Sequence, residues 1–280
     1  MYYLILLLIS VMPIIIIERY IYKKDKNKEP IKLLIKLSLG GILSLIITLI
    51  ISIILGIIFP VLNASTIKQN LVEVFIYAFI GVALVEEFSK WIVTYIITYN
   101  NKEFDELYDM IIYCVFVSLG FACIENIMYV FSSGISVGIR RALFSVPGHA
   151  CNGVFMGYYL GLSKIDKHNK KEDLAKKNLL LSILVPTALH GTFDFCLMSR
   201  QIILLLTFYI FVFILYKKSI KKVNEISKSE NKIESNNVTI ENNNIQNDNN
   251  EQYINCPNCG KLISGNFCPN CGTKNPLAKN

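Results

Sequence analysis

Charge is scarce in this sequence, and so are the residues that interrupt helices. Charged residues make up 18% of the 280 positions against 53% hydrophobic residues, with eight prolines and one tryptophan. Soluble domains carry about 25% charged residues, so this composition and the mean hydropathy of +0.45 exclude an ordinary soluble fold. Residues 37–59 hold no charge at all. Because about 18 apolar residues can cross the hydrocarbon core of a bilayer, the sequence predicts a polytopic membrane protein.

Seven apolar segments are candidates for membrane spans. They are residues 2–17, 37–59, 74–98, 110–131, 142–163, 179–198 and 202–216. The first segment has neither a basic start nor a small-residue cleavage site, so we expect no removable signal peptide. The predicted fold is an all-α transmembrane helix bundle of about seven spans within residues 1–222.

The basic residues predict how this bundle is oriented. Of the 28 Lys and Arg residues, 18 lie in segments 18–36, 164–177 and 217–228, and the net charge is +7. Lys and Arg gather on the cytoplasmic side of membrane proteins, which predicts a multi-pass cell-membrane protein with its N-terminus outside and its C-terminus in the cytoplasm. Nucleic-acid binding would need a basic face with a supporting motif. No such face is present, so the expected surroundings are lipid bilayer and no nucleic acid.

The C-terminal region has a different composition from the bundle. Nine of the 20 residues in 231–250 are Asn, and such a tract buries too little to offset the entropy of folding, so we predict a disordered linker at 223–253. Residues 254–275 contain CPNCG twice, with cysteines Cys256, Cys259, Cys268 and Cys271. Two such turns can hold one tetrahedral zinc ion, and a cytoplasmic location disfavours disulfides. The sequence therefore predicts a structural zinc ribbon, which could contact a cytoplasmic partner.

Few ionisable residues lie inside the predicted spans. Each charged group at mid-bilayer costs about 2.5–3.5 kcal/mol on insertion scales, so such residues are functional candidates. The set comprises Glu86, Glu87, Lys90, Glu125, His149, His190 and Asp194.

Helical spacing brings several of these residues onto common faces. Lys90 lies four residues after Glu86 and three after Glu87, so it can neutralise one of the two carboxylates. His190 and Asp194 are likewise four apart. At about 1.5 Å per residue, Glu125 and both histidines lie roughly 9–12 Å from the outer ends of their spans. We therefore expect the set to meet in the outer half of the membrane.

Two imidazoles and a carboxylate are a recurrent ligand set of catalytic zinc, and a further carboxylate could act as the general base of a hydrolysis. Structural interpretations exist for each part: an ion-pair latch on 86–90, a helix-kink histidine after Pro147, and a structural His190–Asp194 pair. Two other functions also remain open. Intramembrane charges mark ion or proton-coupled transporters, and a non-catalytic membrane scaffold is a further alternative.

The motifs resemble one known family. Glu86-Glu87-Phe88-Ser89-Lys90, Phe121-Ala122-Cys123-Ile124-Glu125-Asn126, Val146-Pro147-Gly148-His149 and His190-Gly191-Thr192-Phe193-Asp194 are similar, in this order, to the motifs of the PrsW intramembrane proteases. That family is related to the CAAX prenyl endopeptidases, which carry His in place of Glu125. The resemblance covers about residues 70–200. It implies a metal-dependent membrane endopeptidase that cuts a membrane-anchored protein such as an anti-sigma factor near the outer membrane surface.

The resemblance also implies roles for individual residues. Glu86 would be the base that activates water, and Glu87 would pair with Lys90, although the two glutamates could exchange roles. Glu125, His149 and His190 would hold a divalent metal, expected to be zinc, with Asp194 as a further ligand or supporting partner. There is no HExxH motif, and a metal-free mechanism using Glu86 and a histidine stays open.

Overall fold

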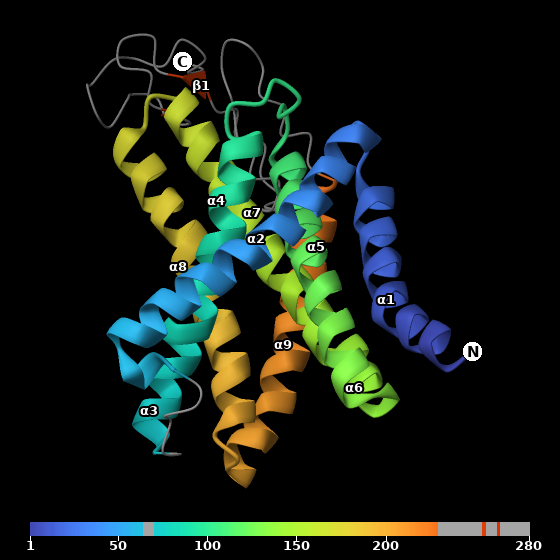
Figure 1. Cartoon of the computed structure of the whole chain (residues 1–280). Helices are drawn as coiled ribbons and strands as arrows, with labels where there is room; N and C mark the ends of the chain where they lie inside the picture. Colours follow the sequence, from blue (N-terminus) through green and yellow to red (C-terminus); the bar gives the residue numbers. More distant parts are fainter. Residues whose placement is uncertain (64–69, 229–253, 256–261, 264–280) are drawn as a thin grey trace. The chain divides into compact units, whose positions relative to one another are not determined.

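The computed structural model describes residues 1–63, 70–228, 254–255 and 262–263, and within these ranges the fold is helical (Figure 1). Its elements are α1 (Tyr2–Lys24), α2 (Ile31–Ile58), the 3₁₀ turn η1 (Pro60–Leu62), α3 (Leu71–Ile76), the π-helix η2 (Tyr77–Leu84), α4 (Val85–Thr98), α5 (Leu107–Ser133), α6 (Ile135–Arg140), the π-helix η3 (Arg141–Ser145), α7 (Val146–His168), α8 (Glu172–Met198) and α9 (Ile202–Ile226). The all-α prediction is confirmed.

The helical segments coincide with the predicted spans and run past most of their ends. Among the described residues, α1, α2, α5, α8 and α9 are long and apolar enough to cross a membrane. The other two predicted spans are composite. One is α3, η2 and α4 in direct succession, and the other is α6, η3 and α7. α9 continues to Ile226, beyond the predicted end of its span at 216, because helical hydrogen bonding does not require apolar side chains.

The C-terminal region forms a second compact unit, Ile240–Asn280. Its described part is a pair of short antiparallel strands, β1 (Ile254–Asn255) and β2 (Leu262–Ile263), with Ile254 opposite Ile263. The four cysteines of the predicted zinc ribbon and the predicted linker after 228 lie outside the described residues.

Helix α5 forms the centre of the bundle. In its most apolar 18-residue window 89% of the residues are buried, against 22–33% in the other four long apolar helices. It packs against α1, α2, α4 and α7. At the start of α5, the Glu106 side chain accepts from the backbone amide of Asp109. In return, the Asp109 carboxylate accepts from the Glu106 amide at 2.7 Å. This capping box satisfies the exposed amides of the first turn.

Two glycines allow α2 and α5 to touch backbone to backbone. A β-carbon on Gly41 would overlap the Val117 carbonyl, and one on Gly120 would overlap the Ser38 carbonyl. Small residues permit such close helix packing in membranes, where dispersion contacts replace the hydrophobic effect as the source of association. Gly120 lies just over one turn before Glu125, so this contact fixes the part of α5 that carries the predicted site residue.

The connection between α1 and α2 carries a buried carboxyl group. Glu29 is 5% exposed, and Tyr113 of α5 donates its hydroxyl to Glu29 Oε2 at 2.7 Å. Burial raises the pKa of Glu29 to about 7; the Tyr113 hydrogen bond lowers it, and the nearby Asp25 carboxylate raises it. This group therefore titrates near neutral pH.

Candidate active site

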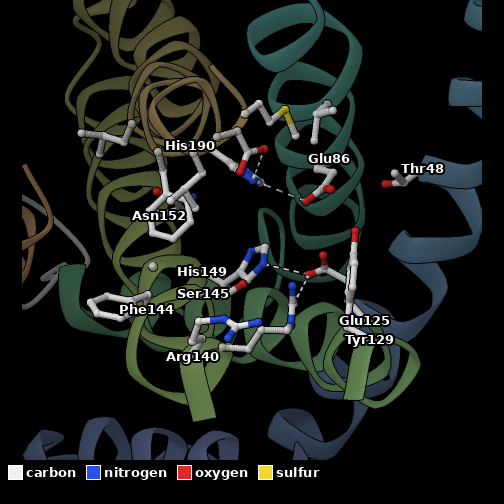
Figure 2. A pocket seen from close by; sticks show the side chains of 18 of the residues that line it. Thr48, Glu86, Glu125, Tyr129, Arg140, Phe144, Ser145, His149, Asn152 and His190 are labelled. Carbon is white, nitrogen blue, oxygen red and sulfur yellow. Dashed lines mark hydrogen bonds and ion pairs between the residues drawn. The ribbon is translucent and has the colours of Figure 1, made fainter. Parts of the chain in front are cut away.

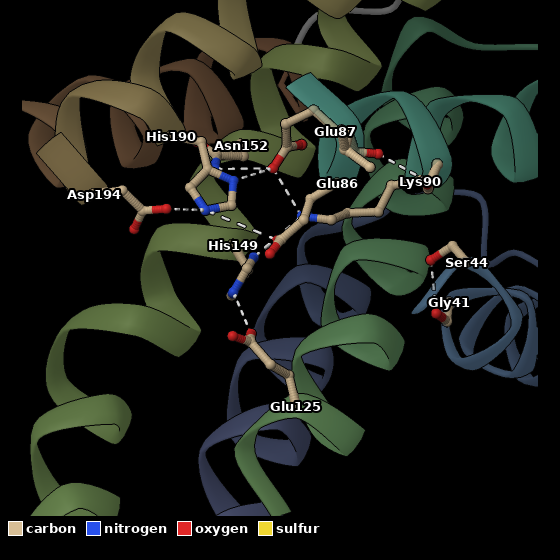
Figure 3. Close-up of polar contacts among 12 residues, drawn as sticks. Gly41, Ser44, Glu86, Glu87, Lys90, Glu125, His149, Asn152, His190 and Asp194 are labelled. Atoms are coloured by element: carbon tan, nitrogen blue, oxygen red, sulfur yellow. Dashed lines mark hydrogen bonds and ion pairs between the residues drawn. The ribbon is translucent and has the colours of Figure 1, made fainter. Parts of the chain in front are cut away.

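The predicted intramembrane residues meet at one place, although they come from four helices. α4 supplies Glu86, Glu87 and Lys90, α5 supplies Glu125, α7 supplies His149, and α8 supplies His190 and Asp194. Figure 3 shows these side chains pointing toward one another between the ribbons.

The first part of the site is a chain of side-chain contacts from Lys90 through Glu87 to His190. Lys90, which has no exposed surface, donates to Glu87 Oε1 at 2.7 Å. The same oxygen accepts from His190 Nδ1 at 2.7 Å and from Asn152 Nδ2 at 3.3 Å. The negative charge of the buried Glu87 carboxylate is thus balanced by Lys90. The same carboxylate orients the ring of His190 by accepting from its Nδ1 (Figure 3). The predicted pairing of Glu87 with Lys90 agrees with this geometry.

The second part centres on His149. Its Nε2 lies 3.0 Å from Glu125 Oε2, and Arg141 Nη2 lies 2.9 Å from the same oxygen. On the other side of the ring, His149 Nδ1 lies 3.2 Å from Lys90 Nζ. Asn126, which follows Glu125 in the sequence, contacts other residues: its Nδ2 donates to the Ser10 carbonyl and its Oδ1 accepts from Arg141 Nε.

Glu86 differs from the other carboxylates of the site. Its Oε2 is buried and has no hydrogen-bond partner among the described residues. Glu87 Oε2 is likewise unbonded, but the other oxygen of Glu87 accepts from Lys90 and His190. The nearest cations to Glu86 are Lys90 Nζ at 3.5 Å and His190 Nε2 at 3.9 Å. One ligand atom each from Glu86, His149 and His190 lie within 4.8 Å of one another. Two imidazole nitrogens and one carboxylate oxygen are the donor set of many catalytic zinc sites, so these residues fit a divalent ion.

Asp194 lies on the far side of His190. Its Oδ2 is 3.4 Å from His190 Nε2, and its side chain is 16% exposed. It faces the same cavity as Glu86 and His190. The spacing of four residues had placed it on the same helix face as His190, and the structure agrees.

The site opens into a cavity of about 800 Å³ (Figure 2). Glu86, Glu125, His149 and His190 lie on its wall, whereas Glu87 and Lys90 are not among its lining residues. The rest of the wall is largely aliphatic and aromatic, and includes Phe144 and Phe208, whose ring centroids are 5.7 Å apart. The cavity therefore combines a polar cluster with an apolar surface suited to an apolar chain segment.

Two π-helical segments precede the helices that carry the site. η2 ends immediately before α4, and η3 ends immediately before α7. Pro147 at the start of α7 has no amide hydrogen, so a carbonyl one turn earlier loses its helical donor. Tyr216 of α9 donates its hydroxyl to the Leu143 and Phe144 carbonyls at 2.9 and 3.0 Å. This hydroxyl supplies the missing hydrogen-bond donor to the irregular turn that leads to His149. Such π-helical turns are frequent at functional sites.

Sequence reasoning missed two polar residues of the site. Asn152 follows His149 by three residues, so its helical spacing could have shown that both share a face. Arg141 lies one residue before the predicted span 142–163, so no spacing within a span pointed to it. Only its position in η3, within ion-pair distance of Glu125, reveals the connection. In a π-helix the usual 3.6-residue periodicity does not apply, and no local pattern would have found it.

Buried carboxylates and histidines inside a membrane bundle, arranged as ligands around a cavity, define a membrane-embedded metal-dependent hydrolase. Comparison with known proteins gives the same class. The sequence profile of the PrsW family intramembrane metalloproteases matches residues 29–217. The chain belongs to this family, and it is an intramembrane metalloprotease.

Several relatives carry the name Protease PrsW. That of Oceanobacillus iheyensis is 39% identical over 218 residues, covering 77% of this chain and 94% of the relative. That of Clostridioides difficile is 33% identical over 225 residues, covering 79% and 90%. That of Bacillus subtilis is 32% identical over 224 residues, covering 78% and 95%. No solved structure matches the chain.

Proposed function

We propose that Glu86, His149 and His190 hold the catalytic metal, and that this metal is zinc. The observation that carries the proposal is their convergence within 4.8 Å from three different helices. The family resemblance implied Glu125 as the carboxylate ligand and Glu86 as the base. The geometry favours Glu86 as the ligand, because Glu125 is already paired with Arg141 and His149.

The two histidines are oriented by the carboxylates behind them. Glu87 accepts from His190 Nδ1, and Glu125 accepts from His149 Nε2. The remaining nitrogens are His190 Nε2, 3.4 Å from Asp194 Oδ2, and His149 Nδ1, 3.2 Å from Lys90 Nζ, so an ion bound there would replace these contacts. Histidine ligands of metals almost always have such an outer partner, which sets the tautomer and the ring orientation. Glu87 does not line the cavity, so it cannot reach a substrate-side water and serves as the partner of His190.

When bound, a divalent ion would supply Lewis-acid activation of water and of the scissile carbonyl. We propose that Asp194 is the residue that accepts a proton from the attacking water. It lies on the cavity wall next to His190, and among the carboxylates of the site it is the one that no lysine or arginine of the described residues holds at salt-bridge distance. Proton acceptance by a positioned carboxylate is typically worth about 10²–10⁴-fold in rate.

The proposed substrate is a membrane-anchored protein, such as an anti-sigma factor, cut near the outer membrane surface. Glu125 and His190 each lie eight residues before the C-terminal ends of α5 and α8, at Ser133 and Met198. At about 1.5 Å per residue this is roughly 12 Å from those ends. With the N-terminus outside and the C-terminus cytoplasmic, these are the outer ends. A reporter fused after Tyr216 should therefore be active only as a cytoplasmic one.

Metal analysis of the purified full-length chain tests the ligand proposal. His149→Ala and His190→Ala should each lose metal from the core and abolish cleavage of a single-span reporter protein. His168→Ala is the matched control, because this third histidine is exposed at the end of α7 and should leave both properties intact. Full metal content in either ligand variant would contradict the assignment.

A further inference from the structure

Arg141 is a largely buried cation in the site that the proposed mechanism does not use. It begins η3, six residues after the start of α6 and eight before His149. Its side chain is 14% exposed, and its Nη2 lies 2.9 Å from Glu125 Oε2. A charged group in a membrane span is costly unless it is paired, so its position needs an explanation.

Two further contacts hold the guanidinium in place. Its Nε donates to Asn126 Oδ1 at 2.9 Å, and its Cζ lies 4.4 Å from the centroid of the Tyr129 ring. Asn126 is itself fixed, because its Nδ2 donates to the Ser10 carbonyl of α1 at 2.8 Å. The planar fork of Arg thus contacts two neighbouring residues of α5 at once, which the single ammonium of a lysine cannot reproduce.

The arrangement repeats on the opposite side of the site. There Lys90 pairs with Glu87 at 2.7 Å, and Glu87 accepts from His190 at 2.7 Å. Here Arg141 pairs with Glu125 at 2.9 Å, and Glu125 contacts His149 at 3.0 Å. Each histidine therefore has a carboxylate behind it, and each carboxylate has its own cation.

We infer that Arg141 is a positioning residue for the proteolytic reaction, which holds Glu125 against His149 Nε2 and so fixes the orientation of the imidazole ring in the site. The inference rests on the proposed role of His149 as a ligand. Without the guanidinium, the Glu125 carboxylate loses the charge that fixes its place, and His149 loses a defined orientation.

The test compares Arg141→Gln with Arg140→Gln in the full-length chain in lipid nanodiscs. Arg140 carries the same charge one residue earlier and also borders the cavity, but its side chain is exposed and its Nη1 donates to Ser136 on its own helix at 2.9 Å. It therefore controls for the loss of a positive charge at the cavity without the contact to Glu125. Two readouts are taken: Zn²⁺ affinity of the chelator-treated protein, and kcat and KM on a quenched single-span reporter protein. Zinc bound by the C-terminal cysteines is the same in all variants and is subtracted.

Changes in the outer partners of metal-binding histidines typically cost about 10–100-fold in metal affinity or activity. Arg141→Gln should therefore weaken Zn²⁺ binding and lower kcat by about this factor, with KM changed by less than about 3-fold. Arg141→Lys should recover part of kcat, because an ammonium can still pair with Glu125. Arg140→Gln should lower kcat by less than about 3-fold.

A double mutant separates positioning from a general structural effect. If Arg141 acts through Glu125, adding Arg141→Gln to Glu125→Gln should change kcat and Zn²⁺ affinity little further, since residues that act as a unit are not additive. Additive losses, or equal losses in Arg140→Gln and Arg141→Gln, would overturn the inference. So would unchanged Zn²⁺ affinity and kcat in Arg141→Gln while His149→Ala loses its metal. Metal retained by His149→Ala would instead overturn the proposed ligand set.

Discussion

Replacing Glu86 by Gln is the sharpest test of the site. The amide keeps the shape of the side chain, and the buried Oε2 makes no hydrogen bond to the described residues that the change would break. Only two ion pairs are lost, to Lys90 at 3.5 Å and to His190 at 3.9 Å. We therefore expect the variant to fold and insert normally.

The expected effect is on the metal. Glu86 supplies one of three proposed ligand atoms, and even an outer partner of a ligand is worth about 10–100-fold in metal affinity. Loss of a ligand should then cost about 100-fold or more in Zn²⁺ affinity, which is about 2.8 kcal/mol or more at 1.4 kcal/mol per factor of ten. Cleavage should fall with metal occupancy and recover in part at high Zn²⁺ concentration.

The assay is metal analysis of the full-length protein beside turnover of a single-span reporter, with Asp194→Asn measured in parallel. Asp194→Asn should keep the metal and lose about 10²–10⁴-fold in turnover, as expected for a lost proton acceptor. A Glu86→Gln protein that keeps its full metal content and loses turnover would refute the ligand assignment. That result would restore the sequence-based prediction of Glu86 as the base.

The remaining predictions concern stability and the supporting residues. Lys90→Ala should destabilise the fold by about 3–5 kcal/mol, measured by thermal unfolding in nanodiscs, because it leaves the buried Glu87 carboxylate without its cation. Tyr216→Phe removes the hydroxyl that donates to two carbonyls of the turn before His149. It should lower kcat while changing the melting temperature little. Cys259→Ser should release one zinc ion from the C-terminal region and leave proteolysis at least partly intact. The pKa of Glu29, raised to about 7 in the folded state, means that the folded protein binds a proton more tightly than the unfolded chain. Stability should therefore fall as pH rises from about 4.5 to 7, and Glu29→Gln should flatten that dependence of the melting temperature.

Each of these has a contrary outcome. A normal melting temperature for Lys90→Ala would show that Glu87 has another source of charge balance. A lowered melting temperature with unchanged kcat in Tyr216→Phe would make the role of this hydroxyl structural alone. Complete loss of cleavage in folded Cys259→Ser protein would place the C-terminal region in the catalytic machinery. A Glu29→Gln protein with an unchanged pH profile would place the titrating group elsewhere.

The sequence alone determined the class of fold and the candidates for the site. Long apolar runs must form helices in a bilayer, because every backbone polar group has to be satisfied internally. Inside such runs a charge is costly enough to stand out, which singled out Glu86, Glu125 and both histidines. Spacings of three and four residues then predicted contacts within one helix, such as Lys90 with Glu87 and His190 with Asp194, and the structure contains both.

Contacts between helices were decided only by the tertiary structure. The rotation of each helix about its axis depends on packing, such as the backbone contact of Gly41 and Gly120 between α2 and α5, and local periodicity does not encode it. For this reason the sequence shows only that Asn126 follows Glu125, whereas the fold turns its amide toward Arg141 and α1. The π-helix η3 shifts the register before α7 and brings Arg141 to Glu125, a pairing that follows from packing and that no sequence spacing predicts.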